Sequence, residues 1–106
     1  MAFKALVMMH ALDADKDKHR SAIVTGKLQL FVVAVKDQKD ALQVAKEFIE
    51  REKVDSIMLC SGFTSFEVAE IAHVAGPTTG VSVARHDGPS YQAIVAALKR
   101  EGFMPS

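Results

Sequence analysis

The sequence predicts an α/β fold: a small four-stranded, mainly parallel sheet with helices on both faces. Apolar, β-branched runs alternate along the chain with segments of helical periodicity. The runs are apolar throughout rather than alternating, which is typical of parallel strands covered on both sides. A chain of 106 residues has room for one hydrophobic core, because a second would be too small to be stable. We therefore expect one domain over residues 1–106.

The four predicted strands are short apolar runs bounded by polar or turn-forming residues. Leu28–Val35 (LQLFVVAV) is the clearest, because it is apolar and rich in β-branched side chains. The other three strands are predicted at Phe3–Met9, Val54–Cys60 and Val81–Arg85.

Three segments have the pattern of amphipathic helices. Asp37–Arg51 places its apolar residues on one face and its charged residues on the other. Thr64–Ala75 begins with the spacing of a capping box between Thr64 and Glu67 and ends before Gly-Pro. Ser90–Glu101 is the last helix, and the residues expected to face inward are Tyr91, Ile94, Val95 and Leu98.

The segment Ala11–Lys27 is ambiguous. Asp13 or Asp15 can cap a helix that ends near Thr25, with Gly26 after it. Such a helix would serve as a parallel crossover, and without it the segment is an unusually long loop for a small domain. We therefore expect a helix here and keep the loop as the alternative.

Short connections and right-handed crossovers favour a flavodoxin-like strand order, 2-1-3-4. In that order the strand Leu28–Val35 lies at an edge of the sheet. An apolar edge strand invites pairing with another chain unless it is covered. We therefore expect a homo-oligomer, a dimer or higher, in which a second subunit covers this edge.

Charge balance and cysteine content limit the classes of partner and compartment. Thirteen basic residues balance thirteen acidic ones, whereas a nucleic-acid or anionic membrane surface would need a basic excess. We expect no nucleic-acid or membrane partner.

The single cysteine, Cys60, has no internal disulfide partner, which favours a reducing compartment, the cytoplasm. The apolar start, Met1 to Leu12, is too short for a membrane span and lacks a signal-peptide cleavage site.

Any functional site should lie where the parallel strands end, because their carboxyl ends meet at one rim of the sheet and ligands usually bind there. That rim collects three candidate reactive groups, His10, Cys60 and His86. The candidate ligand-binding residues follow the same strands: Asp13, Ser61, Gly62, Phe63, Thr64, Arg85, Asp87, Gly88 and Ser90.

The junction from Cys60 to Thr64 leads from a strand through a turn into a helix. Gly62 permits a tight turn, and free N–H groups at the helix start can hold an anion. The same field would make the Cys60 thiol more nucleophilic. The alternative is that Cys60 is an inert, buried residue at a strand end.

The second junction runs from Arg85 to Ser90. Arg85 can clamp a carboxylate or phosphate, and His86 can act as a general acid or base. The alternative is structural: Asp87 and Ser90 cap the helix and Arg85 pairs with a local carboxylate.

His10 ends a central strand, where it is either a reactive group or a hydrogen-bonded structural residue. With Asp13 and Asp15 it matches no standard metal-ligand spacing, so we predict no metal site. The chain also lacks the glycine-rich fingerprints of nucleotide-binding loops, so the sequence assigns no cofactor.

These residues resemble those of a family of small bacterial proteins catalogued as domain of unknown function 6506. The matching segments are Phe3-Lys4-Ala5, His10-Ala11, Asp13-Ala14-Asp15, His19-Arg20, Leu59-Cys60, Gly62-Phe63-Thr64, Val81–Arg85 and Asp87-Gly88-Pro89-Ser90. The resemblance covers nearly the whole chain and implies an α/β fold. It implies no catalytic role, because the family has no established activity.

Two functions are compatible with the sequence. The first is a binding protein, or an enzyme of unknown type, that acts on a small anionic metabolite at the rim. The second is a non-catalytic oligomeric protein whose rim residues serve as caps and interface contacts. A rim at which Cys60, His10 and Arg85 converge would favour the first.

Overall fold

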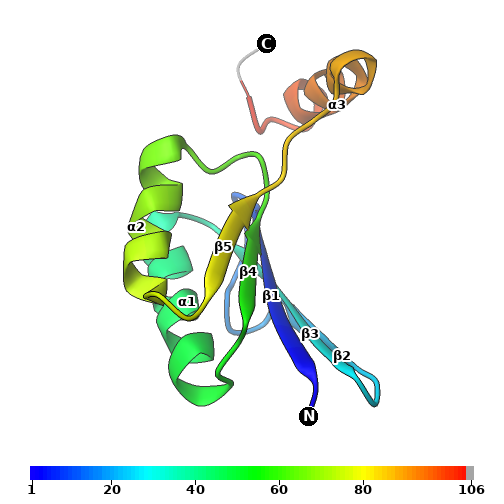
Figure 1. The fold of residues 1–106 in the computed structure, drawn as a ribbon. Coiled ribbons are helices and arrows are strands. Elements are labelled where there is room, and N and C mark those ends of the chain that lie inside the picture. The colour runs from blue at the N-terminus through cyan, green and yellow to red at the C-terminus, as the bar shows by residue number, and fades with distance from the viewer. Residues whose placement is uncertain (105–106) are drawn as a thin grey trace.

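The structure of this protein is a computed structural model that describes residues 1–104, with five strands and three helices (Figure 1). The elements in chain order are β1 (Phe3–His10), β2 (Arg20–Val24), β3 (Leu28–Val35), α1 (Gln38–Arg51), β4 (Ser56–Leu59), α2 (Ser65–Ala75), β5 (Gly80–Val83) and α3 (Gly88–Arg100). All four predicted strands and the three clear helices are present, with ends within two residues of those predicted.

The segment Ala11–Lys27 is a loop followed by the strand β2, so the helix predicted there is wrong. β2 forms a hairpin with β3 and runs antiparallel to it. The Thr25 hydroxyl closes the turn by accepting hydrogen bonds from the N–H groups of Lys27 and Leu28, at 3.2 and 2.9 Å. Gly26, which we expected to stop a helix, lies in this hairpin turn.

The sheet has the order β2-β3-β1-β4-β5. β1, β3, β4 and β5 are parallel, and these four follow one another in the predicted order. The sheet differs from the prediction in its fifth strand, β2, which makes it mixed. Because β2 pairs with β3, the strand Leu28–Val35 is not an edge, and the reason that the sequence offered for a homo-oligomer no longer holds.

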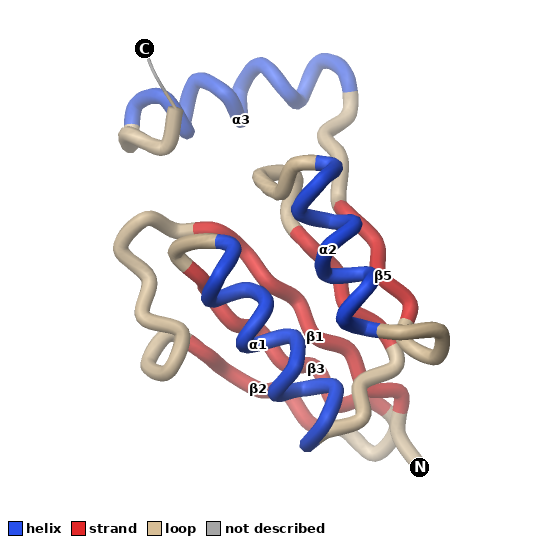
Figure 2. Tube along the Cα trace, turned by 90° about the vertical axis from the view of Figure 1, so that its left-hand side faces the viewer, coloured by secondary structure: helices blue, strands red, loops and turns tan. Residues whose placement is uncertain are grey.

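α1 and α2 lie side by side on one face of the sheet (Figures 1 and 2), so the predicted placement of helices on both faces is wrong. The crossovers from β3 to β4 and from β4 to β5 advance in the same direction across the sheet. Parallel crossovers are almost always right-handed, and two crossovers of the same hand that advance in the same direction place their helices on the same face.

The hydrophobic core lies between this face and the two helices. Alternate strand residues point toward the helices, as the period of two requires. The strand residues of the core are Leu6, Met8, Val33, Val35, Ile57 and Leu59, each at most 1% exposed. The helices contribute Ala41, Val44, Ala45, Phe48, Ile71 and Ala75.

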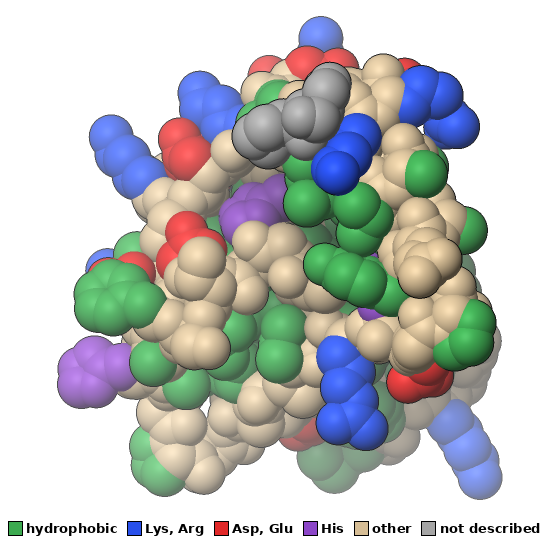
Figure 3. Space-filling view, turned by 90° about the horizontal axis from the view of Figure 1, so that it is seen from above, with side chains coloured by type: hydrophobic (Ala, Val, Ile, Leu, Met, Phe, Trp, Pro, Cys, Tyr) green, Lys and Arg blue, Asp and Glu red, His purple; other side chains and the backbone are tan. Residues whose placement is uncertain are grey.

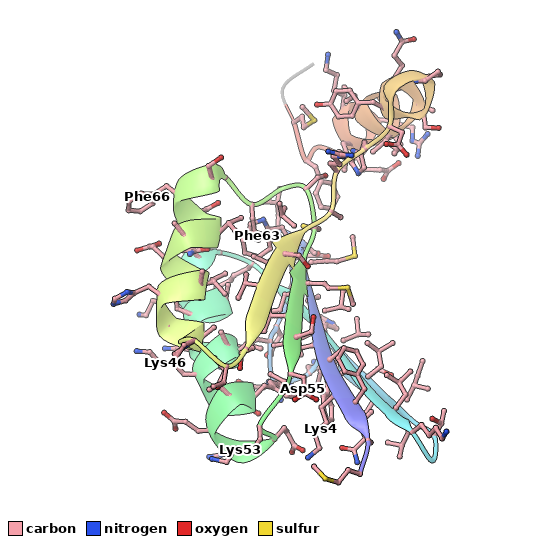
Figure 4. All side chains as sticks on the ribbon, in the orientation of Figure 1. Lys4, Lys46, Lys53, Asp55, Phe63 and Phe66 are labelled. Atoms are coloured by element: carbon pink, nitrogen blue, oxygen red, sulfur yellow. The ribbon has the colours of Figure 1, made fainter. Side chains whose placement is uncertain are left out.

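The other set of alternate strand residues forms a surface that we call the open face. Its members are Phe3, Ala5, Val7 and Met9 of β1, Ser21 and Ile23 of β2, Leu28, Leu30, Val32 and Ala34 of β3, Ser56 and Met58 of β4, and Gly80 and Ser82 of β5. No helix lies on this face of the sheet among the residues described (Figure 4).

An ion pair attaches β2 to α1. The Arg20 guanidinium donates two hydrogen bonds to the Glu47 carboxylate, at 2.8 and 3.3 Å, and lies 5.4 Å from the centre of the Phe48 ring. The hydrogen bond with Glu47 raises the pKa of Arg20, so the guanidinium is always charged.

α3 lies beyond the carboxyl ends of the strands, apart from the other two helices (Figures 1 and 2). None of its residues is buried, and it makes few contacts with the sheet or with α1 and α2. Tyr91 is 49% exposed, so the expectation that it faces a core is wrong. Among residues 1–104, α3 is the last element of regular structure.

Candidate functional site

The carboxyl ends of β1, β4 and β5 bring the two predicted junctions together at one rim of the sheet. Cys60 directly follows β4, and Arg85 and His86 follow β5. His10 is the last residue of β1, between β3 and β4 in the sheet. Viewed from above, this end of the molecule has a histidine and several hydrophobic side chains near its middle, and most of the Lys and Arg side chains lie toward its margin (Figure 3).

The turn after β4 is anchored by Phe63. This side chain is 5% exposed and belongs to the core, on the side of the sheet that carries α2 (Figure 4). The N–H of Phe63 donates to the carbonyl of Cys60 at 3.3 Å, which closes the turn. Phe63 therefore fixes the position of the residues before it and does not itself reach solvent.

His10 packs against this turn. Its ring stacks on Phe63, with the ring centres 3.9 Å apart and an interplanar angle of 21°. A Cβ atom added to Gly62 would lie 3.3 Å from Nδ1 of His10. Only glycine therefore allows this close approach without a shift of the imidazole. His10 is half-buried and is held at the rim by aromatic packing.

Cys60 contacts His10 through the backbone. The N–H of His10 donates to Sγ of Cys60 at 3.4 Å, and the partly buried thiol also packs against the core. This contact brings Cys60 and His10 together as predicted. It also gives the thiol a structural role, because its partner is a backbone N–H rather than an imidazole that could take its proton.

The contact that joins the two junctions is a hydrogen bond between Ser61 and His86. Oγ of Ser61 lies 3.1 Å from Nε2 of His86. The other ring nitrogen of His86, Nδ1, is buried and has no hydrogen-bond partner among residues 1–104. The ring of Tyr91 lies 5.6 Å from that of His86. We assigned Tyr91 to the core from its helical spacing, and so did not expect it at the rim.

Thr64 acts as the N-cap of α2. Its hydroxyl accepts from the N–H of Glu67 at 3.2 Å, and the Glu67 carboxylate accepts from the N–H of Thr64 at 2.9 Å. The predicted capping box is confirmed. It places a negative charge where we expected an anion to bind, so the start of α2 is a poor anion site.

The remaining predicted ligand-binding residues are exposed. Asp13 lies in the loop after β1, and Arg85 lies in the connection between β5 and α3. Asp87 caps α3 through its backbone, since its side chain makes no capping hydrogen bond. Gly88 and Ser90 belong to the first turn of α3. Arg85 forms no ion pair within residues 1–104, so its guanidinium is available to a ligand.

A polar hollow of about 360 Å³ lies at the other half of the rim, next to β1 and β3. It is lined by Ala14, Asp15, Lys16, Asp17, Lys36 and Asp40. The backbone N–H of Asp17 donates to the Asp15 carboxylate at 2.9 Å and lowers the pKa of Asp15. In the sequence, only the charged segments that follow β1 and β3 indicated this hollow. Their mixed signs leave it without a clear preference for cations or anions.

A second hollow of about 360 Å³ is apolar and lies between α1 and α2. It is lined by Leu42, Phe66, Ala69, Glu70, His73 and Val74. The sequence did not single it out, since these residues form helix surfaces. Within residues 1–104 there is no cluster of three or more His, Cys, Asp or Glu side chains that could hold a metal ion.

The fold and the rim define a small α/β protein with a mixed five-stranded sheet, two helices packed on one face, and two histidines gathered where parallel strands end. The chain belongs to the family of unknown function DUF6506, whose model matches residues 3–99. A comparison with curated proteins and a comparison with solved structures each returned no match. None of the helices described is long and apolar enough to cross a membrane.

Proposed function

We propose that this protein binds a small anionic metabolite at the rim formed by the ends of β1, β4 and β5. The observation that carries the proposal is the hydrogen bonding of the two ring nitrogens of His86. One ring nitrogen shares a hydrogen bond with Ser61, and the other is buried and has no partner among the residues that the structure describes. A buried polar atom without a partner costs about 1–3 kcal/mol, and a ligand oxygen that bonded Nδ1 would remove this cost.

The groups around His86 favour an anion as this ligand. When the Ser61 hydroxyl donates to Nε2, the proton of a neutral imidazole lies on Nδ1, which is then a hydrogen-bond donor. Arg85 is the preceding residue and supplies an exposed guanidinium, the group best suited to a carboxylate or phosphate. His10 offers a second imidazole beside Gly62.

We propose that a ligand reaches Nδ1 through a movement of α3, whose Tyr91 ring lies 5.6 Å from the ring of His86. The atom is buried, and α3 begins at Gly88, two residues after His86. Because α3 makes few contacts with the rest of the chain, its displacement breaks little packing. Ligand entry by a shift of α3 is therefore part of the proposal.

Ser61 and His86 are also spaced as a nucleophile and its base. A catalytic triad would also need a carboxylate that accepts a hydrogen bond from the other ring nitrogen. Nδ1 has no such partner among the residues described. We therefore propose binding as the function and His86 as the acid or base of any reaction on the bound ligand. The structural contact of Cys60 makes its thiol the weaker choice.

A thermal-shift screen tests the proposal. The probes are inorganic phosphate, small dicarboxylates and divalent metal chlorides, and the variants are His86→Asn and Arg85→Ala. A ligand at a hundred times its Kd adds about 2.7 kcal/mol of stability, so we expect a clear rise in Tm for the wild type with at least one anion. We expect each variant to lose most of that rise.

Two matched controls lie outside the rim. His73→Asn removes an exposed histidine of α2, and Arg51→Ala removes an exposed arginine at the end of α1. Both should respond to the anion as the wild type does. The proposal fails if no anion stabilises the wild type, or if the rim variants respond as strongly as these controls.

A non-catalytic oligomeric protein is the second candidate. The open face favours it, since that surface is apolar and no helix of residues 1–104 lies on it. In this case the rim residues only cap and pack, and His86→Asn changes stability without changing any response to anions.

A further inference from the structure

We infer that the open face of the sheet is an interface through which two copies of this chain form a dimer. The first observation is its composition. Ten of its fourteen residues are apolar, three are serine, one is glycine, and none is charged. A sheet face that remains in water normally carries polar residues at these positions. This inference does not depend on ligand binding at the rim.

The second observation is exposure. Four large apolar side chains of the open face are between two-fifths and just over half exposed: Phe3 at 52%, Met9 at 53%, Ile23 at 54% and Met58 at 41%. They come from three different strands, so the exposure extends across the sheet. Side chains project from this face, and no helix in the described part of the chain lies opposite them (Figure 4). Contiguous apolar surfaces of this kind mark sites of protein association.

The chain's own α3 cannot cover this surface. α3 follows β5, at one end of the strand order. A helix is about 10 Å wide and strands are about 4.8 Å apart, so one helix covers about two strands. If α3 folded back it would reach β5 and β4, whose open-face residues are Ser56, Met58, Gly80 and Ser82. The apolar part on β1, β3 and β2 would remain uncovered.

The size of the open face is that of a small stable interface. With about 3.3 Å per residue and about 4.8 Å per strand, the five strands present a flat area on the order of 500 Å². Two copies then bury about 1,000 Å², the lower limit for a specific interface. Neither α1, α2 nor α3 offers an uncharged apolar surface of comparable size, because each carries charged residues.

The absence of charge on the open face favours a second copy of this chain as the partner that covers it. Complementary charges give an interface specificity for a partner of different sequence, and the open face carries none. An uncharged apolar surface is complementary to itself, as an interface around a two-fold axis requires. The two sheets then pack face to face, with the helices of both copies on the outside.

The test measures self-association of the full chain by analytical ultracentrifugation over a concentration series. The variants are Met9→Lys and Ile23→Lys, at positions that are exposed in the single chain. The control is Phe66→Lys, because Phe66 is 73% exposed on the outer side of α2 (Figure 4). Far-ultraviolet circular dichroism verifies that all three variants fold.

We expect a wild-type dimer and at least about 100-fold weaker association in each open-face variant, because the two-fold axis would bury the lysine charge twice. Phe66→Lys should associate like the wild type. In mixed dimers of labelled and unlabelled chains, we expect nuclear Overhauser contacts between methyl groups of Ile23, Leu30 and Val32 across the interface. A wild type that is monomeric throughout overturns the inference. So does a dimer that Phe66→Lys weakens equally, or one whose contacts run through α1 and α2.

Discussion

The attachment of β2 to α1 allows a quantitative test of the structure. Arg20→Ala removes the two hydrogen bonds to Glu47, the contact with the Phe48 ring, and a hydrogen bond from Nε to the carbonyl of Lys16 at 2.8 Å. Glu47→Ala removes only the ion pair. The two substitutions therefore separate the pair from the other contacts of Arg20.

The expected magnitudes follow from the exposure of the pair. The side chains of Arg20 and Glu47 are 27% and 32% exposed, and a partly exposed bidentate pair contributes about 1 kcal/mol. The contact with the aromatic ring adds about 0.5–1 kcal/mol, and the hydrogen bond to the backbone about 1 kcal/mol. We expect Arg20→Ala to lower the free energy of unfolding by about 2–3 kcal/mol and Glu47→Ala by about 1 kcal/mol.

Urea denaturation of the wild type, both single variants and the double variant measures the coupling energy directly. We expect about 1 kcal/mol, reduced in concentrated salt. The control is the same cycle at Arg100 and Glu101, which are 70% and 60% exposed; its coupling should lie within error of zero. Equal coupling energies at the two pairs would refute the argument that β2 is attached through this ion pair.

Three further predictions concern the core, a cap and a carboxylate. Ile71→Ala, at a fully buried position, should lower the free energy of unfolding by about 2–5 kcal/mol in urea; a much smaller loss would contradict the packing of α2 on the sheet. Thr64→Ala should cost about 1 kcal/mol and speed exchange of the Glu67 amide proton, and unchanged exchange would count against the capping box. The carboxyl of Asp15 should titrate below 3.8 by NMR, because the N–H of Asp17 lowers its pKa. Its contribution to stability is therefore present above pH 3.8 and lost as the pH falls below that value, and a midpoint at or above 3.8 would contradict this loop structure.

Much of the fold was predictable because its signals are local. Continuous β-branched runs and well-capped amphipathic segments determine elements over a few residues, and four strands and three helices were found in this way. β2 was missed because the segment Ala11–Lys27 was expected to connect parallel strands, which favoured a helix. Yet Thr25-Gly26-Lys27 between apolar runs is a hairpin signal, and Gly26 was interpreted as a helix stop instead.

The placement of the helices could not be predicted from composition. Strands that are apolar on both faces indicate only that both faces are covered, and not what covers them. For the site, the meeting of His10 with Cys60 followed from parallel topology. The bond between Ser61 and His86, and the unpartnered Nδ1, depend on how the two connections bend beyond the sheet, and no local pattern encodes this.

The two edge strands of the sheet, β2 and β5, are short. β2 has five residues and β5 has four, whereas β1 and β3 have eight. Short outer strands offer few free backbone groups to an incoming chain, which limits edge-to-edge addition. The sheet therefore tapers at both sides and discourages lateral growth into fibres. Short outer strands in this way limit strand-by-strand addition in a chain whose sheet also carries an apolar open face.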